Sequence, residues 1–238
     1  MDSKMTVGVV GAGNMGSGIA QKLAQEGLDV ILQDMKQDFV DRGLTNIRKT
    51  LEQGVERKIL TPQQVEETMA RVKGTDDPRD LANADLIIEA IFEDEKVKKD
   101  LFANLDTICA PKTILATNTS SFYVSELAKA TNRPDRFVGM HYFYHPAKNR
   151  LLEIIPHEGT SQETVSKALE VGRLHGKTTI VVKDDAGFCV NQFFSPFLTE
   201  AVHVLQEGIA DIPTIEEAAK RAFKIGMGPF ELMNVTGI

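Results

Sequence analysis

The stretch Thr6-Val-Gly-Val-Val-Gly-Ala-Gly-Asn-Met-Gly16 decides the fold. Its first five residues form a nearly continuous apolar run, which predicts a strand buried on both faces. Glycines follow directly: Gly11 would allow a tight turn, Gly13 a close approach of the backbone to a pyrophosphate, and Gly16 close packing of a helix on the strand. Because the helix start also offers unpaired N–H groups, we expect a dinucleotide site here. The loop that would form it comprises Gly11, Gly13, Asn14, Met15 and Gly16.

A carboxylate stands at the predicted end of the second strand. Asp34 closes the apolar run 28–34, and it lies 18 residues after Gly16. A carboxylate at this place can accept hydrogen bonds from both adenosine ribose hydroxyls and would repel a 2′-phosphate. The position therefore favours NAD over NADP, although a turn-forming Asp at a strand end is the simpler alternative.

The rest of the chain alternates between strand-like and helix-like segments. Further strands are expected at 28–34, 85–91, 114–117, 136–140, 151–155 and 178–182, and helices at 17–25, 96–107, 124–131 and 162–174. Strands that alternate with helices indicate βαβ units and a mostly parallel sheet covered on both faces. The fold class predicted is α/β, a Rossmann-like doubly wound sheet followed by a short or truncated all-helical C-terminal domain.

Two segments depart from simple alternation. Residues 36–73 are too long for one crossover, and Thr61-Pro62 matches an N-cap followed by Pro at N1. We therefore expect a helical insertion there, a helix pair with a break near 60. The strand pattern stops after Val182, and helical periodicity begins at Phe188. The predicted domains are 1–185, which would bind NAD, and 186–238, the start of a helical domain.

Composition limits the function classes. The chain has 238 residues, 42% apolar and 26% charged, as in ordinary soluble globular proteins. Its net charge of −7 argues against a nucleic-acid partner. No signal peptide or membrane-length apolar run is evident, so we expect no membrane partner and a cytoplasmic location. Cys109 and Cys189 lack metal-ligand spacing. They are predicted to be buried reduced thiols, and no metal site is predicted.

Polar residues gather where the predicted strands end. Glu93 follows the strand 85–91, Asn118 and Ser120 follow 114–117, and His141 follows 136–140. Ligands of open parallel sheets bind beyond the carboxyl ends of the strands. A hydroxyl, an imidazole and a carboxylate at one sheet edge can remove a proton from an alcohol while hydride leaves its carbon. Glu153, an acid within an apolar strand, needs a partner, and His141 is the obvious one.

Several motifs in order resemble the NAD-dependent L-3-hydroxyacyl-CoA dehydrogenases, a family of fatty-acid β-oxidation and the butanoate pathway. The matching stretches are VVGAGNMG at 9–16, EAIFE at 89–93, NTSS at 118–121, GMH at 139–141, LEI at 152–154, AGFCVN at 186–191 and GPFEL at 228–232. Together they span residues 5 to about 235, which makes the signal far more specific than the glycine motif alone.

The resemblance implies roles for individual residues. His141 would be the general base for the 3-hydroxyl and Glu153 its carboxylate partner. Ser120 would bind the reacting oxygen, and Asn191 would position the substrate. Glu93, Lys98 and Asn118 would lie on the ribose and nicotinamide side of the cofactor. For Ser120 an N-cap and for Asn191 a helix-start hydrogen bond are the plainer alternatives.

The resemblance also implies an acyl-CoA substrate and a homodimer formed through the helical C-terminal domain. The helix pair at 36–73 would close over the CoA moiety. Basic candidates for the CoA phosphates are Arg48, Lys49, Arg57 and Lys58. A solvated basic face is the simpler interpretation of these four residues.

The chain departs from the family in two places. The family runs His-Phe-Phe-Asn-Pro after its catalytic histidine, whereas this chain has Tyr144, His145 and Pro146 there, with the spacing from His141 to Glu153 unchanged. The helical domain is about half the family's length, which suggests a truncated chain. The first departure affects substrate identity more than reaction type.

The sequence is compatible with three functions. The first is reversible oxidation of an L-3-hydroxyacyl-CoA to the 3-oxoacyl-CoA with NAD. The second is an NAD-dependent dehydrogenase of a non-CoA hydroxy acid or sugar acid that uses the same base. The third is a non-catalytic NAD-binding protein of the crystallin kind. That third function predicts loss of Ser120, His141, Glu153 or Asn191, and all four are present.

Overall fold

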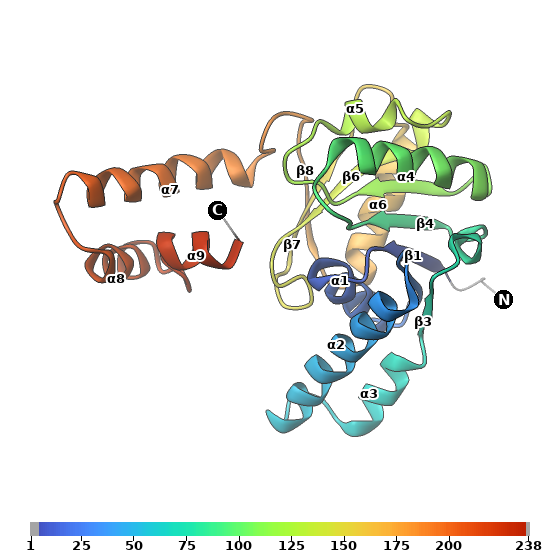
Figure 1. Cartoon of the computed structure of the whole chain (residues 1–238), viewed down its shortest axis with the longest axis horizontal. Helices are drawn as coiled ribbons and strands as arrows, with labels where there is room; N and C mark the ends of the chain where they lie inside the picture. The colour runs from blue at the N-terminus through green and yellow to red at the C-terminus, as the bar shows by residue number, and fades with distance from the viewer. Residues whose placement is uncertain (1–4, 237–238) are drawn as a thin grey trace. The chain divides into compact units, whose positions relative to one another are not determined.

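The computed structural model describes residues 5–236, in two compact units that meet at Ala186 and Gly187. The first unit is built on one eight-stranded sheet in the order β3-β2-β1-β4-β5-β6-β7-β8 (Figure 1). The strands are β1 (Thr6–Val10), β2 (Asp29–Gln33), β3 (Val72–Thr75), β4 (Leu86–Glu89), β5 (Ile114–Thr117), β6 (Phe137–Tyr142), β7 (Leu151–Ile155) and β8 (Thr178–Val181). Neighbouring strands pair in parallel except β6 with β7, which are antiparallel. The predicted doubly wound, mostly parallel α/β fold is confirmed.

Helices accompany the sheet in this unit, and several of them pack against its strands. They are α1 (Asn14–Gln25), α2 (Gln37–Glu56), α3 (Pro62–Met69), α4 (Glu95–Ile108), α5 (Val124–Ala128) and α6 (Gln162–Leu174), with short 3-10 turns at Pro78–Leu81 and Pro134–Arg136. Helix α1 contacts β1 and β2, while α6 contacts β6, β7 and β8. All four residues of β4 and of β5 are buried, which explains why both strands are apolar up to their last residues, Glu89 and Thr117.

The segment after β2 differs from its prediction at one end. Helix α2 ends at Glu56 and α3 begins after Thr61, whose hydroxyl accepts a hydrogen bond from the Gln64 backbone in a capping box. Residues 72 and 73, predicted to be helical, instead begin β3. This strand was missed because its sequence, Val-Lys-Gly-Thr, holds a single large apolar residue. Such a pattern suits an edge strand with one face in solvent.

The second unit consists of three helices in its described part. These are α7 (Val190–Gln206), α8 (Ile212–Phe223) and α9 (Pro229–Thr236), and each contacts the other two. Asp211 caps α8 by accepting a hydrogen bond from the Thr214 backbone N–H. Phe193 and Phe223 are largely exposed, so this unit presents apolar side chains at its surface.

The cysteines differ from each other in burial. Cys109 is buried, and burial raises the pKa of its thiol to about 11. Cys189 is only half-buried, so the prediction that both thiols are buried is wrong for this one. Within residues 5–236 we find no helix with the length and apolar character needed to cross a membrane.

Candidate active site

The glycine loop between β1 and α1 has the shape of a pyrophosphate cradle. Gly11 has φ +102°, and a Cβ on Gly16 would lie 1.7 Å from the Gly11 carbonyl oxygen. Any side chain at either position would therefore prevent this turn. A Cβ on Gly13 would meet nothing within 4 Å, and no side chain caps the start of α1. Open space beside uncapped helix N–H groups fits a bound dinucleotide.

Asp34 lies immediately after β2 and contacts this loop. Its Oδ2 accepts a hydrogen bond from the Ala12 backbone N–H (2.7 Å), and its Oδ1 accepts one from Met35 N–H (2.7 Å). Each carboxylate oxygen has two lone pairs, so both can still accept from ribose hydroxyls. The carboxylate is thus held at the edge of the cradle in a fixed orientation.

Glu93 organises the turn that follows β5. Its Oε1 accepts hydrogen bonds from Thr119 Oγ1 (2.5 Å), Ser120 N–H (2.9 Å) and Ser121 N–H (3.1 Å). Burial raises the pKa of Glu93, but the charge of Lys98 and these donors outweigh burial and lower it overall. The Ser120 hydroxyl is therefore carried by a turn that an ionised carboxylate holds in place.

Lys98 is almost completely buried at 1% exposure, and two carboxylates surround its ammonium. Its Nζ donates to Glu89 Oε1 (2.5 Å) and lies 3.1 Å from Glu93 Oε2. The second oxygen of Glu89 accepts a hydrogen bond from Thr117 Oγ1 (2.7 Å). Sequence reasoning did not assign Glu89 a role, although an acid that ends an apolar strand is a recognisable signal for a buried ion pair.

Three side chains from three neighbouring segments form a continuous hydrogen-bonded line. His141 and Glu153 stand opposite each other in the antiparallel β6–β7 pair, and Ser120 comes from the turn after β5. The His141 Nδ1 lies 2.7 Å from Glu153 Oε2, and its Nε2 lies 3.0 Å from Ser120 Oγ. Glu153 is fully buried and His141 is 4% exposed. With Glu153 ionised, its oxygen can only accept, which assigns the proton to Nδ1 and turns the Nε2 lone pair toward Ser120.

The position of His141 differs from the predicted one. It lies inside β6, one residue before that strand ends, rather than in a loop beyond it. The Tyr142 backbone N–H donates to Asn118 Oδ1 (2.8 Å), so the amide after β5 is bonded to the end of β6. The catalytic candidate is thus fixed by ladder hydrogen bonds as well as by its side-chain partners.

Comparison with known proteins identifies the family. The model for the NAD-binding domain of 3-hydroxyacyl-CoA dehydrogenase matches residues 6–185, and the model for that enzyme's C-terminal domain matches residues 187–238. The chain belongs to the 3-hydroxyacyl-CoA dehydrogenase family. The predicted NAD cofactor is confirmed, and the chain is an NAD-dependent oxidoreductase.

Relatives agree with this assignment along almost the whole chain. A probable 3-hydroxybutyryl-CoA dehydrogenase of Deinococcus radiodurans is 40% identical over 234 residues, 98% of this chain and 84% of the relative. The crystal structure of M. tuberculosis FadB2 has a TM-score of 0.94 at 33% identity, covering 98% of this chain and 83% of that one. The (S)-3-hydroxybutyryl-CoA dehydrogenase PaaH1 of Ralstonia eutropha has a TM-score of 0.93 at 36% identity, with the same coverage.

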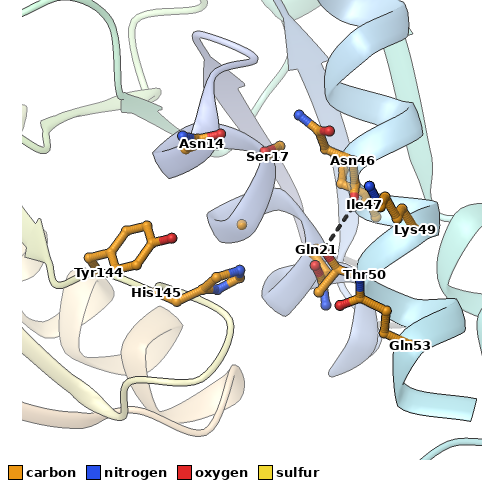
Figure 2. Close-up of a pocket in the computed structure, with 11 residues that line it drawn as sticks. Asn14, Ser17, Gln21, Asn46, Ile47, Lys49, Thr50, Gln53, Tyr144 and His145 are labelled. Atoms are coloured by element: carbon orange, nitrogen blue, oxygen red, sulfur yellow. Dashed lines mark hydrogen bonds between the residues drawn. The ribbon is translucent and has the colours of Figure 1, made fainter. Parts of the chain in front are cut away.

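A pocket of about 220 Å³ lies beside the cofactor loop of this family member. Figure 2 shows Tyr144 and His145 facing α1 and α2 across this space. The lining residues are Asn14, Ser17, Gly18, Gln21, Asn46, Ile47, Lys49, Thr50, Gln53, Tyr144 and His145. This lining is mostly polar and includes one lysine but no carboxylate. An anionic or amide-bearing ligand would therefore fit the pocket.

The basic residues predicted to meet CoA phosphates separate into different places. Lys49 lines the pocket, whereas Arg48 is bonded to Glu66 of α3 (2.6 Å). Arg57 caps the end of α2, and Lys58 follows it with φ +57°. Only Lys49 of these four is a pocket residue among the residues that the structure describes.

Asn191 and Met15 make ordinary structural contacts in the structure. Asn191 is in the first turn of α7, in the second unit, and its N–H donates to the Gly187 carbonyl (3.1 Å). Met15 is half-buried and packs against the core beside its neighbours in the glycine loop. Their predicted roles in substrate and cofactor binding stay predictions.

Proposed function

We propose that this enzyme catalyses the reversible oxidation of an L-3-hydroxyacyl-CoA to the 3-oxoacyl-CoA, with His141 as general base and Glu153 as its partner. The observation that carries this proposal is the line Ser120 Oγ, His141 Nε2, Nδ1 and Glu153 Oε2, with links of 3.0 and 2.7 Å. A base whose second nitrogen is bonded to a buried carboxylate has its tautomer and its orientation fixed.

The proton follows a short path. The substrate 3-hydroxyl gives its proton to His141 Nε2. NAD, held at the glycine loop and Asp34, would supply the acceptor for the hydride that leaves the same carbon. Glu153 stabilises the imidazolium that forms. The Ser120 hydroxyl lies within hydrogen-bond reach of Nε2, so it can hold the reacting oxygen next to the base. In the reverse direction the imidazolium returns the proton to the 3-oxo group's oxygen.

The substrate class rests on the pocket and on the names of the relatives. Those relatives are 3-hydroxybutyryl-CoA dehydrogenases, and the pocket beside the cofactor loop carries Lys49 for a phosphate and several amides for a polar arm. We infer that the acyl group is short and that CoA extends along α1 and α2. Asn191 positions the substrate, and the second unit forms the homodimer contact with its exposed phenylalanines.

One observation favours a second function. Tyr144 and His145, which replace the family's Asn and Pro, both line the pocket. A changed pocket with an unchanged base is what an NAD-dependent dehydrogenase of a non-CoA hydroxy acid would show.

Initial rates of NADH oxidation separate the two functions. We expect turnover of acetoacetyl-CoA and other short 3-oxoacyl-CoA substrates, with rates that fall as the acyl chain lengthens. Free 3-oxo acids at matched concentrations should be reduced at least a hundredfold more slowly, about 3 kcal/mol of transition-state binding. Equal or faster reduction of the free acids would replace the first function by the second.

A further inference from the structure

The loop between β6 and β7 supplies two side chains to the pocket beside the cofactor cradle. Tyr144 and His145 face α1 and α2 across it, as Figure 2 shows. They occupy the positions where this chain departs from the sequence pattern of its family. The mechanism proposed above makes no use of either residue, so their presence in the pocket calls for a separate explanation.

The hydrogen bonds of His145 determine what it can offer a ligand. Its Nδ1 accepts from the Ala147 backbone N–H (3.3 Å), which places the ring proton on Nε2 in the neutral form. Within residues 5–236 the Nε2 atom has no hydrogen-bond partner. An N–H donor in the pocket wall, with no protein acceptor, is available to donate to an acceptor on a bound ligand.

The loop that carries this donor is fixed in place. Lys177 donates from Nζ to the carbonyl oxygens of Pro146 (2.5 Å) and Asn149 (2.5 Å). On the other side, a Cβ on Gly18 of α1 would lie 2.7 Å from Pro146 Cγ, so the loop packs directly on the helix. The backbone that carries His145 is therefore held by Lys177 on one side and packed on α1 on the other.

The charge state of His145 favours an uncharged acceptor. Burial lowers the pKa of its imidazole, and the charges of Lys148 and Lys177 lower it further. The ring is therefore neutral at neutral pH and offers an ordinary N–H donor. The cation of the same pocket is Lys49, which is the natural partner for a phosphate.

We propose that His145 is a specificity-determining residue, which donates a hydrogen bond from Nε2–H to an amide carbonyl of the substrate's pantetheine arm, with the Tyr144 hydroxyl beside it. This inference rests on the proposed function, since it assumes that the arm of an acyl-CoA enters the pocket. His145 is four positions after His141, and four extended residues span at most about 14 Å. An arm that leaves the thioester near His141 can therefore pass His145.

The test compares substrates with and without the arm. Initial rates are measured for acetoacetyl-CoA, acetoacetyl-pantetheine and the S-ethyl thioester of acetoacetate, which lacks amides. The variants are His145→Phe, which removes the donor, and His145→Gln, which restores an N–H near the same place. His157→Phe is the matched control, because this histidine lies outside the pocket and bonds the Pro134 carbonyl (3.0 Å).

We expect His145→Phe to raise KM about fivefold for the two arm-bearing substrates, the effect of one neutral hydrogen bond, with kcat within twofold. The ethyl thioester should be reduced as by the unaltered enzyme. His145→Gln should recover most of the loss, and His157→Phe should show none. Bound NADH fluorescence and the unfolding midpoint report whether each variant is folded.

The outcomes separate this inference from the proposed function. If the unaltered enzyme does not reduce acetoacetyl-CoA, the proposed function fails, and this inference with it. If it does so but His145→Phe acts equally on all three substrates, or His145→Gln is as impaired as His145→Phe, the arm is not recognised here and only this inference fails. Unchanged kinetics for both variants overturn it equally.

Discussion

The β6–β7 hairpin presents histidines in two contrasting ways. His141 lies within a strand, 4% exposed, with both ring nitrogens engaged by side chains from neighbouring segments. His145, four residues later, is on the loop, and its side chain lines the pocket. The first is held by a sheet ladder and a buried carboxylate, the second by a loop that one lysine anchors. Under the two proposals above, the reaction chemistry would lie on the rigid sheet and substrate recognition on the adjacent loop.

The largest effect is expected when His141, the proposed base, is replaced. We expect His141→Gln to lower kcat for acetoacetyl-CoA reduction by about 10⁴-fold, because general acid–base catalysis is lost. NADH affinity, measured by fluorescence titration, should change less than threefold. Turnover equal to that of the unaltered enzyme would show that His141 is not the base. It would also favour a different reaction site.

Glu153→Gln tests whether the charge of Glu153 supports His141 as the proposed base. The amide carbonyl still accepts from Nδ1–H, but it carries no charge to stabilise an imidazolium. We therefore expect kcat to fall about a hundredfold, less than for His141→Gln, with KM nearly unchanged. Steady-state kinetics give both values, and unfolding curves exclude a misfolded variant. A rise in KM with unchanged kcat would mean that Glu153 acts in substrate recognition and not in the reaction.

Lys177→Met tests the anchoring of the loop. Two carbonyls would lose their donor, so the loop should loosen and KM for acetoacetyl-CoA should rise about tenfold, with kcat within threefold. Steady-state kinetics check this, and Lys148→Met, an exposed lysine of the same loop, serves as control. A fall in kcat at constant KM would mean that Lys177 supports the base instead.

The smallest expected effect concerns His175, which contacts Tyr142, the residue that follows His141 in β6. His175 is buried, and its Nε2 lies 3.1 Å from the Tyr142 hydroxyl. Burial lowers the pKa of His175 to about 4, against 6.5 in the unfolded chain. Between these values the unfolded chain binds a proton that the folded chain does not, so stability falls as pH drops from 6.5 to 4. Compared with His175→Gln, the unaltered chain should lose about 1 kcal/mol more per pH unit in urea unfolding. Parallel curves for the two proteins would contradict this.

Much of the fold was predictable because its strands are buried. Apolar runs such as Thr6–Val10 are long enough to be recognised, while β3 has one large apolar residue and lies at the sheet edge. The pairing of His141 with Glu153 was predictable, because an acid inside an apolar strand demands a partner. Lys177 was not, because its partners are backbone carbonyls that only the folded chain brings near. Glu89, an acid that ends an apolar strand, did carry a signal for a buried ion pair. Catalysis by the predicted site residues stays a prediction.

The antiparallel register of β6 and β7 has a consequence for how such enzymes diversify. His141 and Glu153 are paired directly across the ladder, so their separation is set by strand spacing and not by the residues that connect the strands. The connecting loop can therefore vary in sequence without changing the pairing of His141 with Glu153. Grafting loops of other sequences onto this hairpin would be a practical route to new substrate preferences in one unaltered catalytic frame.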